Sequence, residues 1–179
     1  MVLAIAGRRI DKPGTAPVFP LENVEMVRKK IAEFLISKRP VSIVSSAACG
    51  ADLIALEAAG ELGIERYVML PYAPEIFKTA SVTDRPGKWE MIFDTIIEES
   101  KKSSRLILLD FSINDKNAFE KTNTEILNKA AELSDSGKNN VQALIVWDGK
   151  AKDNDITLHF KKEAEEKGYT INEINTVKL

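Results

Sequence analysis

The sequence contains few of the residues that build metal centres and disulfide bonds. Its 179 residues include one cysteine and one histidine. A disulfide within the chain, a two-cysteine zinc site and a histidine-rich metal centre are therefore excluded. Since no paired acidic motif typical of a magnesium site stands out either, we expect no metal site.

Long apolar runs and an excess of one charge are also missing. No run approaches the roughly 20 apolar residues that span a bilayer. The apolar start at 2–6 is short and lacks the preceding basic segment of a secretory signal. Lys and Arg number 25 against 27 Asp and Glu, a formal net charge of −2. Because nonspecific affinity for nucleic acid comes from basic excess, we expect no nucleic-acid partner and no membrane partner.

The remaining composition is that of a globular protein. Hydrophobic residues make up 44% of the chain, enough for a sizeable core at this length. We therefore expect one soluble, cytoplasmic domain over residues 1–179, and we leave open whether it forms a homo-oligomer.

Short apolar runs alternate with longer amphipathic stretches along the chain. Uniformly apolar runs predict buried strands, and apolar residues at helical spacing predict helices. The predicted strands are 2–6, 41–44, 66–70, 106–109 and 142–147, with a weak sixth at 169–174; the predicted helices are 21–36, 51–62, 87–102, 117–134 and 156–167.

This alternation predicts an α/β fold with a mainly parallel, doubly wound sheet and helices on both faces. We expect the strand order 3-2-1-4-5, which places residues 2–6 inside the sheet. The sixth strand, if it forms, should lie at the edge.

Ligands in such folds bind outside the carboxyl ends of the strands, near the point where the strand order reverses. Polar and special-backbone residues do follow the predicted strands, although loops are polar in any protein. The candidates outside the second loop are Gly7, Arg8, Asp11, Pro71, Asp110, Trp147, Asp148 and Gly149.

The loop after the second strand is the most distinctive, because it consists almost wholly of small residues. It contains Ser45, Ser46, Ala47, Ala48, Cys49, Gly50, Ala51 and Asp52. Small residues let the backbone approach a ligand, and amides at the start of the next helix favour a phosphate. Gly50 would supply a positive φ or an empty volume facing the ligand. Asp52 would cap the helix or meet a ribose hydroxyl. A tight strand-to-helix turn explains the same residues without a ligand.

The run from Ser46 to Ala58, SAACGADLIALEA, resembles a bacterial branch of the SLOG superfamily, named after the Smf DNA-processing proteins and the lonely-guy (LOG) enzymes. Gly7-Arg8-Arg9-Ile10-Asp11 resembles its Gly-His-x-Ile-Asp start, with an arginine for the histidine. Further similar segments are Phe19-Pro20, Val68–Tyr72 with Glu75 and Phe77, Ser81-Val82 with Trp89 and Phe93, Asn123, and Trp147-Asp148-Gly149.

The resemblance covers roughly residues 4–168 and implies a Rossmann-like domain that binds a nucleotide or nucleotide-derived ligand, often as a sensor. This chain departs from the pattern at the second phosphate loop. The family has Gly-Gly-Thr where this chain has Asn154-Asp155-Ile156-Thr157, so only Thr157 remains, and an aspartate repels phosphate. The PGGxGTxxE segment of the hydrolytic LOG enzymes is absent, so no catalytic glutamate is implied.

Individual candidates each have two interpretations. Arg8 would bind a phosphate through parallel hydrogen bonds or form a surface ion pair. Trp147 would stack on a base or pack in the core. Cys49 would be a nucleophile only with a base, and the one histidine, His159, is better explained as a helix-face residue.

Aspartates near the strand ends are weak catalytic candidates. Each has three interpretations: it cleaves an N-glycosidic bond, holds a ribose, or forms a cap or turn. The residues concerned are Asp11, Asp110 and Asp148, together with Asp52. We therefore expect a domain that binds or senses a nucleotide-like small molecule. An N-glycosidic hydrolase or transferase and a scaffold with a degenerate pocket are the alternatives.

Overall fold

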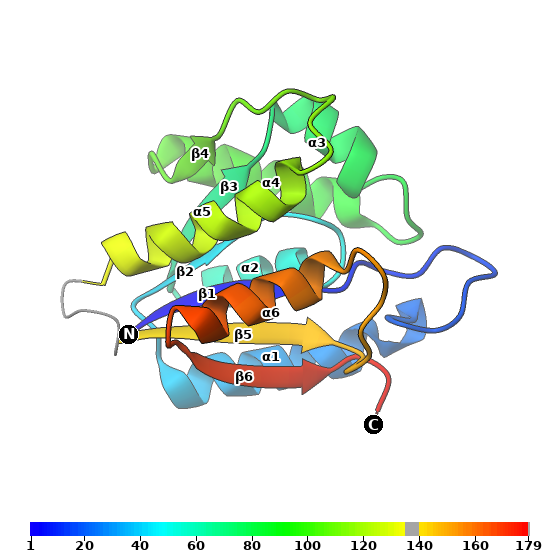
Figure 1. The fold of residues 1–179 in the computed structure, drawn as a ribbon, viewed down its shortest axis with the longest axis horizontal. Coiled ribbons are helices and arrows are strands. Elements are labelled where there is room, and N and C mark those ends of the chain that lie inside the picture. The colour runs from blue at the N-terminus through cyan, green and yellow to red at the C-terminus, as the bar shows by residue number, and fades with distance from the viewer. Residues whose placement is uncertain (135–139, 179) are drawn as a thin grey trace.

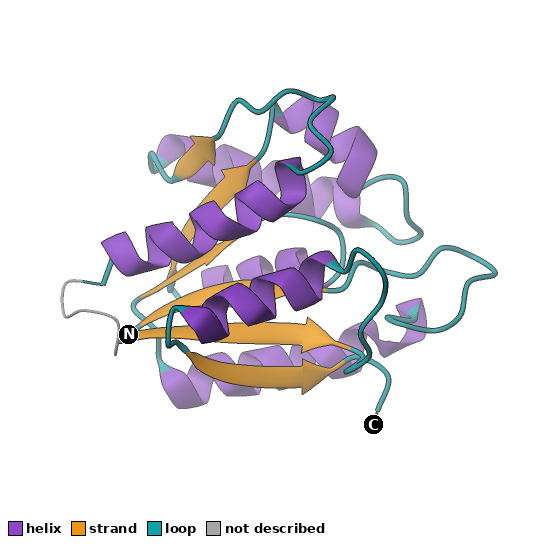
Figure 2. Cartoon of the chain, in the orientation of Figure 1, coloured by secondary structure: helices purple, strands orange, loops and turns teal. Residues whose placement is uncertain are grey.

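The structure, a computed structural model, describes residues 1–134 and 140–178. In this part of the chain, six strands form one sheet in which every neighbouring pair is parallel. Figure 2 shows the strands as arrows. They are β1 (Val2–Gly7), β2 (Ser42–Ser45), β3 (Glu65–Leu70), β4 (Leu106–Leu108), β5 (Val141–Trp147) and β6 (Thr170–Asn175).

The strand order is β4-β3-β2-β1-β5-β6. It confirms that β1 lies inside the sheet and that the sixth strand is an edge. The predicted place of the strand at 106–109, between the first and fifth strands, is wrong, because β4 lies at the opposite edge beside β3. β4 has only three residues, none of them buried, whereas β5 has seven, six of them buried. The longer strand has more apolar residues to bury, so it gains more from the place beside β1.

Helices cover both faces of the sheet (Figure 1). On one face lie α1 (Val24–Lys38), α2 (Ala51–Glu61) and α4 (Trp89–Lys102); on the other lie α5 (Ala118–Glu132) and α6 (Ile156–Glu166). A short 3-10 helix, η1 (Leu21–Asn23), precedes α1, and the sequence did not indicate the short helix α3 (Pro74–Ser81). The fold is thus a doubly wound, Rossmann-like α/β sheet, as predicted.

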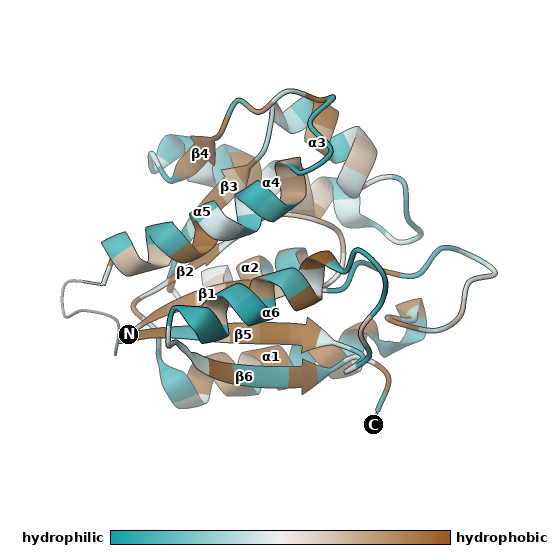
Figure 3. Ribbon diagram, viewed as in Figure 1, coloured by the Kyte–Doolittle hydropathy of each residue, from teal (hydrophilic) through white to brown (hydrophobic). Residues whose placement is uncertain are grey.

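Each face of the sheet has its own apolar core. Alternate strand residues point to opposite faces, so Leu3 and Ile5 pack under α1 and α2 while Val2 and Ala4 pack under α5 and α6. In Figure 3 the strand β5 is largely hydrophobic, while the edge strand β6 and the helices carry hydrophilic residues as well. α2 is buried along most of its length because it packs between α1 and α4, and its alanines allow this close approach.

The order of the strands reverses between β1 and β5. The chain proceeds from β1 through β2 and β3 to β4 at one edge, and α5 then carries it back across to β5 on the other side of β1. A crevice is expected outside the carboxyl ends of β1 and β5. In the part of the chain that the structure describes, no helix is both long and apolar enough to cross a membrane.

Candidate functional site

A cleft of about 640 Å³ opens at the carboxyl end of β1. It lies where the first residues after β1 and β2 meet the starts of α5 and α6. Predicted site residues that line it are Gly7, Arg8, Asp11, Ser46, Ala48, Asp52, Asn123 and Thr157. The structure therefore brings together residues from four separate segments that the sequence had marked.

A second hollow, of about 750 Å³, lies between residues 82 and 98 beside α4. Although it is slightly larger, it is away from the carboxyl ends of β1 and β5. Apart from Arg85, none of its lining residues belongs to the cleft. The cleft at the strand ends is therefore the better candidate for a ligand site.

Arg8 lies at this cleft, but its guanidinium is already occupied. Its Nε donates to Asp148 Oδ1 at 2.9 Å, and its two terminal nitrogens donate to the Asp155 carboxylate at 2.6 and 2.8 Å. It also donates to the Lys150 carbonyl oxygen at 2.7 Å. Burial alone would lower the pKa of Arg8, but the hydrogen bonds to Asp155 and Asp148 outweigh it and raise the pKa. Arg8 therefore anchors the loop after β5, and a ligand phosphate would have to displace these carboxylates.

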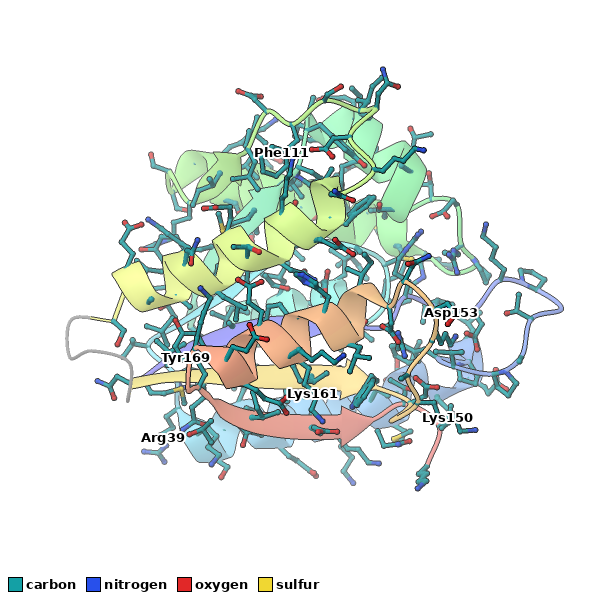
Figure 4. All side chains as sticks on the ribbon, viewed as in Figure 1. Arg39, Phe111, Lys150, Asp153, Lys161 and Tyr169 are labelled. Carbon is teal, nitrogen blue, oxygen red and sulfur yellow. The ribbon has the colours of Figure 1, made fainter. Side chains whose placement is uncertain are left out.

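Asp155 occupies the place where the family resemblance implied a phosphate. It is the N-cap of α6, and its carboxylate accepts hydrogen bonds from the Leu158 and Lys152 backbone amides at 3.0 and 3.1 Å. Burial would raise the pKa of Asp155, but the bonds from Arg8 and these amides hold it below its ordinary value. The protein thus supplies its own anion at the start of α6. Figure 4 shows Lys150 and Asp153 in the same loop, at the end toward which β5 and β6 point.

Three backbone amides of the small-residue loop donate to groups inside the protein. Those of Ala48, Cys49 and Ala51 donate to the Asp52 side chain, the Ser81 carbonyl and the Arg8 carbonyl. Ser45 is buried and donates its hydroxyl to the Ile5 carbonyl at 3.0 Å. These four groups take part in the tight strand-to-helix turn and are not available to a phosphate.

Gly50 does have a positive φ, of 100°. A Cβ atom at this position would lie 2.7 Å from the Arg8 carbonyl oxygen and 3.0 Å from the Ile10 amide nitrogen. The empty volume thus faces the backbone after β1 rather than a ligand. Substitution of Gly50 by a larger residue would therefore disturb the backbone packing of the fold, and it would say little about ligand binding in the cleft.

Asp52 has a buried carboxyl group with one free oxygen. The residue is 7% exposed and lines the cleft. Oδ2 accepts the Ala48 amide at 3.3 Å, whereas Oδ1 has no hydrogen-bond partner in the described chain. Burial raises the pKa of Asp52 to about 7, although hydrogen bonds from the backbone and the charge of Arg9 oppose the shift. Asp52 can therefore accept or donate a proton near neutral pH.

Arg9 and Arg85 form the positively charged side of the cleft. Both guanidinium groups pair with Asp84, and Arg85 also donates to the Ile10 carbonyl oxygen at 2.8 Å. Since two arginines share one carboxylate, the group has one excess positive charge. The Arg9 Nε is buried and has no hydrogen-bond partner among the described residues. Arg9 and Arg85 are therefore better placed than Arg8 to bind an anionic group of a ligand.

The sequence interpretation chose Arg8 and did not name Arg9 or Arg85 as site residues. Adjacent residues at a strand end point to opposite faces. Arg8 accordingly reaches the loop after β5, while Arg9 reaches Asp84 on the loop after α3. That alternation could have separated the roles of the two arginines. It could not show that Arg8 would meet two carboxylates, those of Asp148 and Asp155.

Several predicted residues have structural roles or lie elsewhere. Asp11 accepts the Val18 and Phe19 backbone amides, which closes the loop 11–19. Asp110 follows the edge strand β4 and is exposed outside the cleft lining. The residues Pro71, Trp147, Asp148 and Gly149 do not line the cleft. Trp147 is buried and donates to Glu173 at 2.7 Å, which supports the core interpretation.

Cys49 and His159 do not form a catalytic pair. Cys49 is fully buried, and burial raises the pKa of its thiol, although Arg9 partly offsets the effect. His159 lies half-buried on α6 near Glu163, and it does not line the cleft. Among the described residues, no three His, Cys, Asp or Glu side chains gather in a way that could hold a metal ion.

The fold is similar to that of a DNA-processing protein. The structure of DNA processing protein A (DprA) from Streptococcus pneumoniae matches with a TM-score of 0.58 and 17% sequence identity. The match covers 96% of this chain and 49% of DprA, so this chain spans about half of that protein's length. No protein-family model and no curated protein matches the sequence. At this identity the likeness establishes the fold.

The comparison corrects one expectation from composition. We excluded a nucleic-acid partner because the chain has a net charge of −2. This exclusion is wrong, since a protein that shares the fold is named for processing DNA. A net charge averages over the whole surface, and it does not describe the local charge of Arg9 and Arg85 at the cleft.

Proposed function

We propose that the cleft at the carboxyl end of β1 binds a nucleotide or a nucleotide-derived molecule, as a member of the SLOG superfamily would. The observation that carries the proposal is Asp52, a residue of the cleft lining whose buried Oδ1 has no hydrogen-bond partner among the described residues. Buried polar atoms are normally hydrogen-bonded, and an exception in a cleft indicates a missing ligand donor.

Two kinds of ligand group match the polar surroundings. A ribose hydroxyl or a ring N–H would donate to Asp52 Oδ1. A phosphate would accept from Arg9 and Arg85, which share the carboxylate of Asp84. Asn123 and Thr157, which the sequence had marked, line the same cleft and supply further polar contacts.

The pKa of Asp52 supports a second candidate, cleavage of an N-glycosidic bond. A carboxyl group with a pKa of about 7 is matched to general acid or base catalysis at neutral pH. The other aspartates fit this role less well: Asp148 is paired with Arg8, Asp11 accepts backbone amides, and Asp110 is outside the cleft. Asp52 is therefore the residue that an enzyme at this site would use.

Ligand binding should be measured first, by thermal shift and calorimetry, with nucleoside monophosphates, nucleosides and a short DNA oligonucleotide. A ligand that binds the folded state raises its apparent stability. Arg9→Ala should lower the affinity for the monophosphates by about tenfold or more, because it removes charge-assisted hydrogen bonds. The affinity for the nucleosides should change by less than about threefold.

Arg105→Ala is the matched control, because Arg105 pairs with Glu65 between β3 and β4. Intact ligand after incubation supports a binding or sensor module, and released base supports the enzyme. Binding of the oligonucleotide with no effect of free nucleotides would assign the cleft to DNA. No response to any of these ligands would reject the proposal in favour of a scaffold.

A further inference from the structure

One aromatic side chain in the cleft remains without a role. Phe119 lies in the first turn of α5, lines the cleft and is 37% exposed. Farther along the same helix, Ile126, Leu127 and Ala130 are buried against the sheet. The apolar side of α5 thus extends past the end of the sheet, and Phe119 is the part of it that faces the cleft.

The ring of Phe119 is supported by two other aromatic rings. Tyr72 packs edge-on against it at a centroid distance of 6.1 Å and an interplanar angle of 79°. Phe77 lies at 6.5 Å and is itself fully buried, stacked at 6.1 Å on Phe93. Such packing restrains the orientation of the Phe119 ring, so little conformational entropy would be lost when a ligand contacts it.

Polar groups lie on the same side of α5. Asn123 follows Phe119 by four residues, which places the two side chains on one helix face, and both line the cleft. The Asn123 side-chain nitrogen donates to the Ile156 carbonyl oxygen at 2.9 Å, while its oxygen has no partner among the described residues. Ile156 is also 37% exposed and lines the cleft.

We infer that Phe119 is the platform on which the planar base of the ligand stacks, with Ile156 as a second apolar contact and the Asn123 oxygen available to an N–H at the edge of the base. The inference rests on the proposed function and deepens it, because it assigns the base to the α5 side of the cleft. A ring that is fixed, partly exposed and next to a free polar acceptor is the usual surface for a base.

The test compares ligands with and without a base. The best-binding nucleoside monophosphate of AMP, GMP, CMP and UMP and the base-free ribose 5-phosphate are titrated into wild type and Phe119→Ala. We expect the nucleotide affinity to fall by about 5- to 100-fold, as for loss of one stacked base, and the ribose 5-phosphate affinity to stay within about threefold.

Two further variants keep the result interpretable. Ile113→Ala removes an exposed apolar residue outside the cleft and should change neither affinity. Phe119→Trp should retain nucleotide binding, and its fluorescence should be quenched by the nucleotide beyond the change in wild type, which reports stacking even where ribose 5-phosphate binds weakly.

The outcomes separate the inference from the proposed function. If wild type binds the nucleotide but Phe119→Ala binds it equally well, and Phe119→Trp shows no additional quenching, the stacking role is wrong while the proposed function stands. An equal loss of affinity for the nucleotide and for ribose 5-phosphate in Phe119→Ala would also overturn the stacking role. If wild type binds none of the probes, both are rejected.

Discussion

The carboxyl group of Asp52 lies where its charged form is poorly solvated. Asp52 is in the first turn of α2, where the helix dipole favours a negative charge. Burial nevertheless dominates over the backbone hydrogen bonds, and Oδ1 has no hydrogen-bond partner among the described residues. A side chain that lowers the stability of the folded chain in this way is typical of a functional site.

The raised pKa makes a prediction about stability. The pKa of Asp52 is about 7 in the folded protein against an ordinary 3.8, so ionisation disfavours folding as the pH rises from about 4 to 7. Asn is neutral at every pH and similar in shape. Asp52→Asn should therefore be more stable than wild type at pH 8, by on the order of 2–4 kcal/mol. The gap should be small at pH 4.5.

Denaturant unfolding at the two pH values measures this gap. Asp153→Asn serves as the control, because Asp153 is exposed on the cleft rim, and it should show no such pH dependence. A stability difference between Asp52→Asn and wild type that is the same at pH 4.5 and pH 8 would contradict the shifted pKa.

At the scale of elements, the segment after β5 is held by one buried arginine. Arg8 lies 147 residues from Asp155 in the sequence, and its bonds to Asp155, Asp148 and Lys150 join the end of β1 to the start of α6. The Asp155 side chain is only 1% exposed. Removing one member of such a network leaves a buried charge unpaired, which is more costly than losing a surface ion pair.

Asp155→Ala should accordingly destabilise the protein by about 3–5 kcal/mol, because it leaves Arg8 short of a carboxylate and removes the cap of α6. Asp153→Ala, two residues earlier and exposed, should change stability by less than about 0.5 kcal/mol. Hydrogen exchange of the amides at 150–158 should accelerate in Asp155→Ala alone. Equal stability of the two variants would show that the buried network does not hold this loop.

At the scale of the whole molecule, the strand order decides which loops meet. With β5 rather than β4 beside β1, the loop after β5 and the starts of α5 and α6 border the cleft, and the segment after β4 does not. The global charge of −2 then matters less than the placement of Arg9 and Arg85 at one end of the sheet.

Ligand-induced protection should follow this arrangement. A bound nucleotide should slow hydrogen exchange at 8–18, 46–52, 119–123 and 152–157, all of which border the cleft. Exchange at 110–116, after the edge strand, should be unchanged, and added chelator should not alter the pattern. Protection confined to the region between residues 82 and 98 would place the ligand in the other hollow.

The sequence by itself determined the strands, all of the helices except α3, and the end of the sheet at which to look. Uniformly apolar strands and amphipathic helices each fit one kind of environment, so their alternation was enough to predict a parallel sheet covered on both faces. The rule that ligands bind at the carboxyl ends then led to Asp52, and the family resemblance led to Asn123 and Thr157; all three line the cleft.

Only the tertiary structure decided the order of the strands and the partners of the polar groups. Alternation of strands and helices is compatible with more than one strand order, and the place beside β1 depended on the length and burial of β5. How many carboxylates pair with Arg8 and with Arg9 depended on Asp155, Asp148 and Asp84, which lie far from both in the sequence. The exposure of Phe119 likewise depended on where the sheet ends, because burial is set by neighbours in space and helical spacing records only which residues share a face.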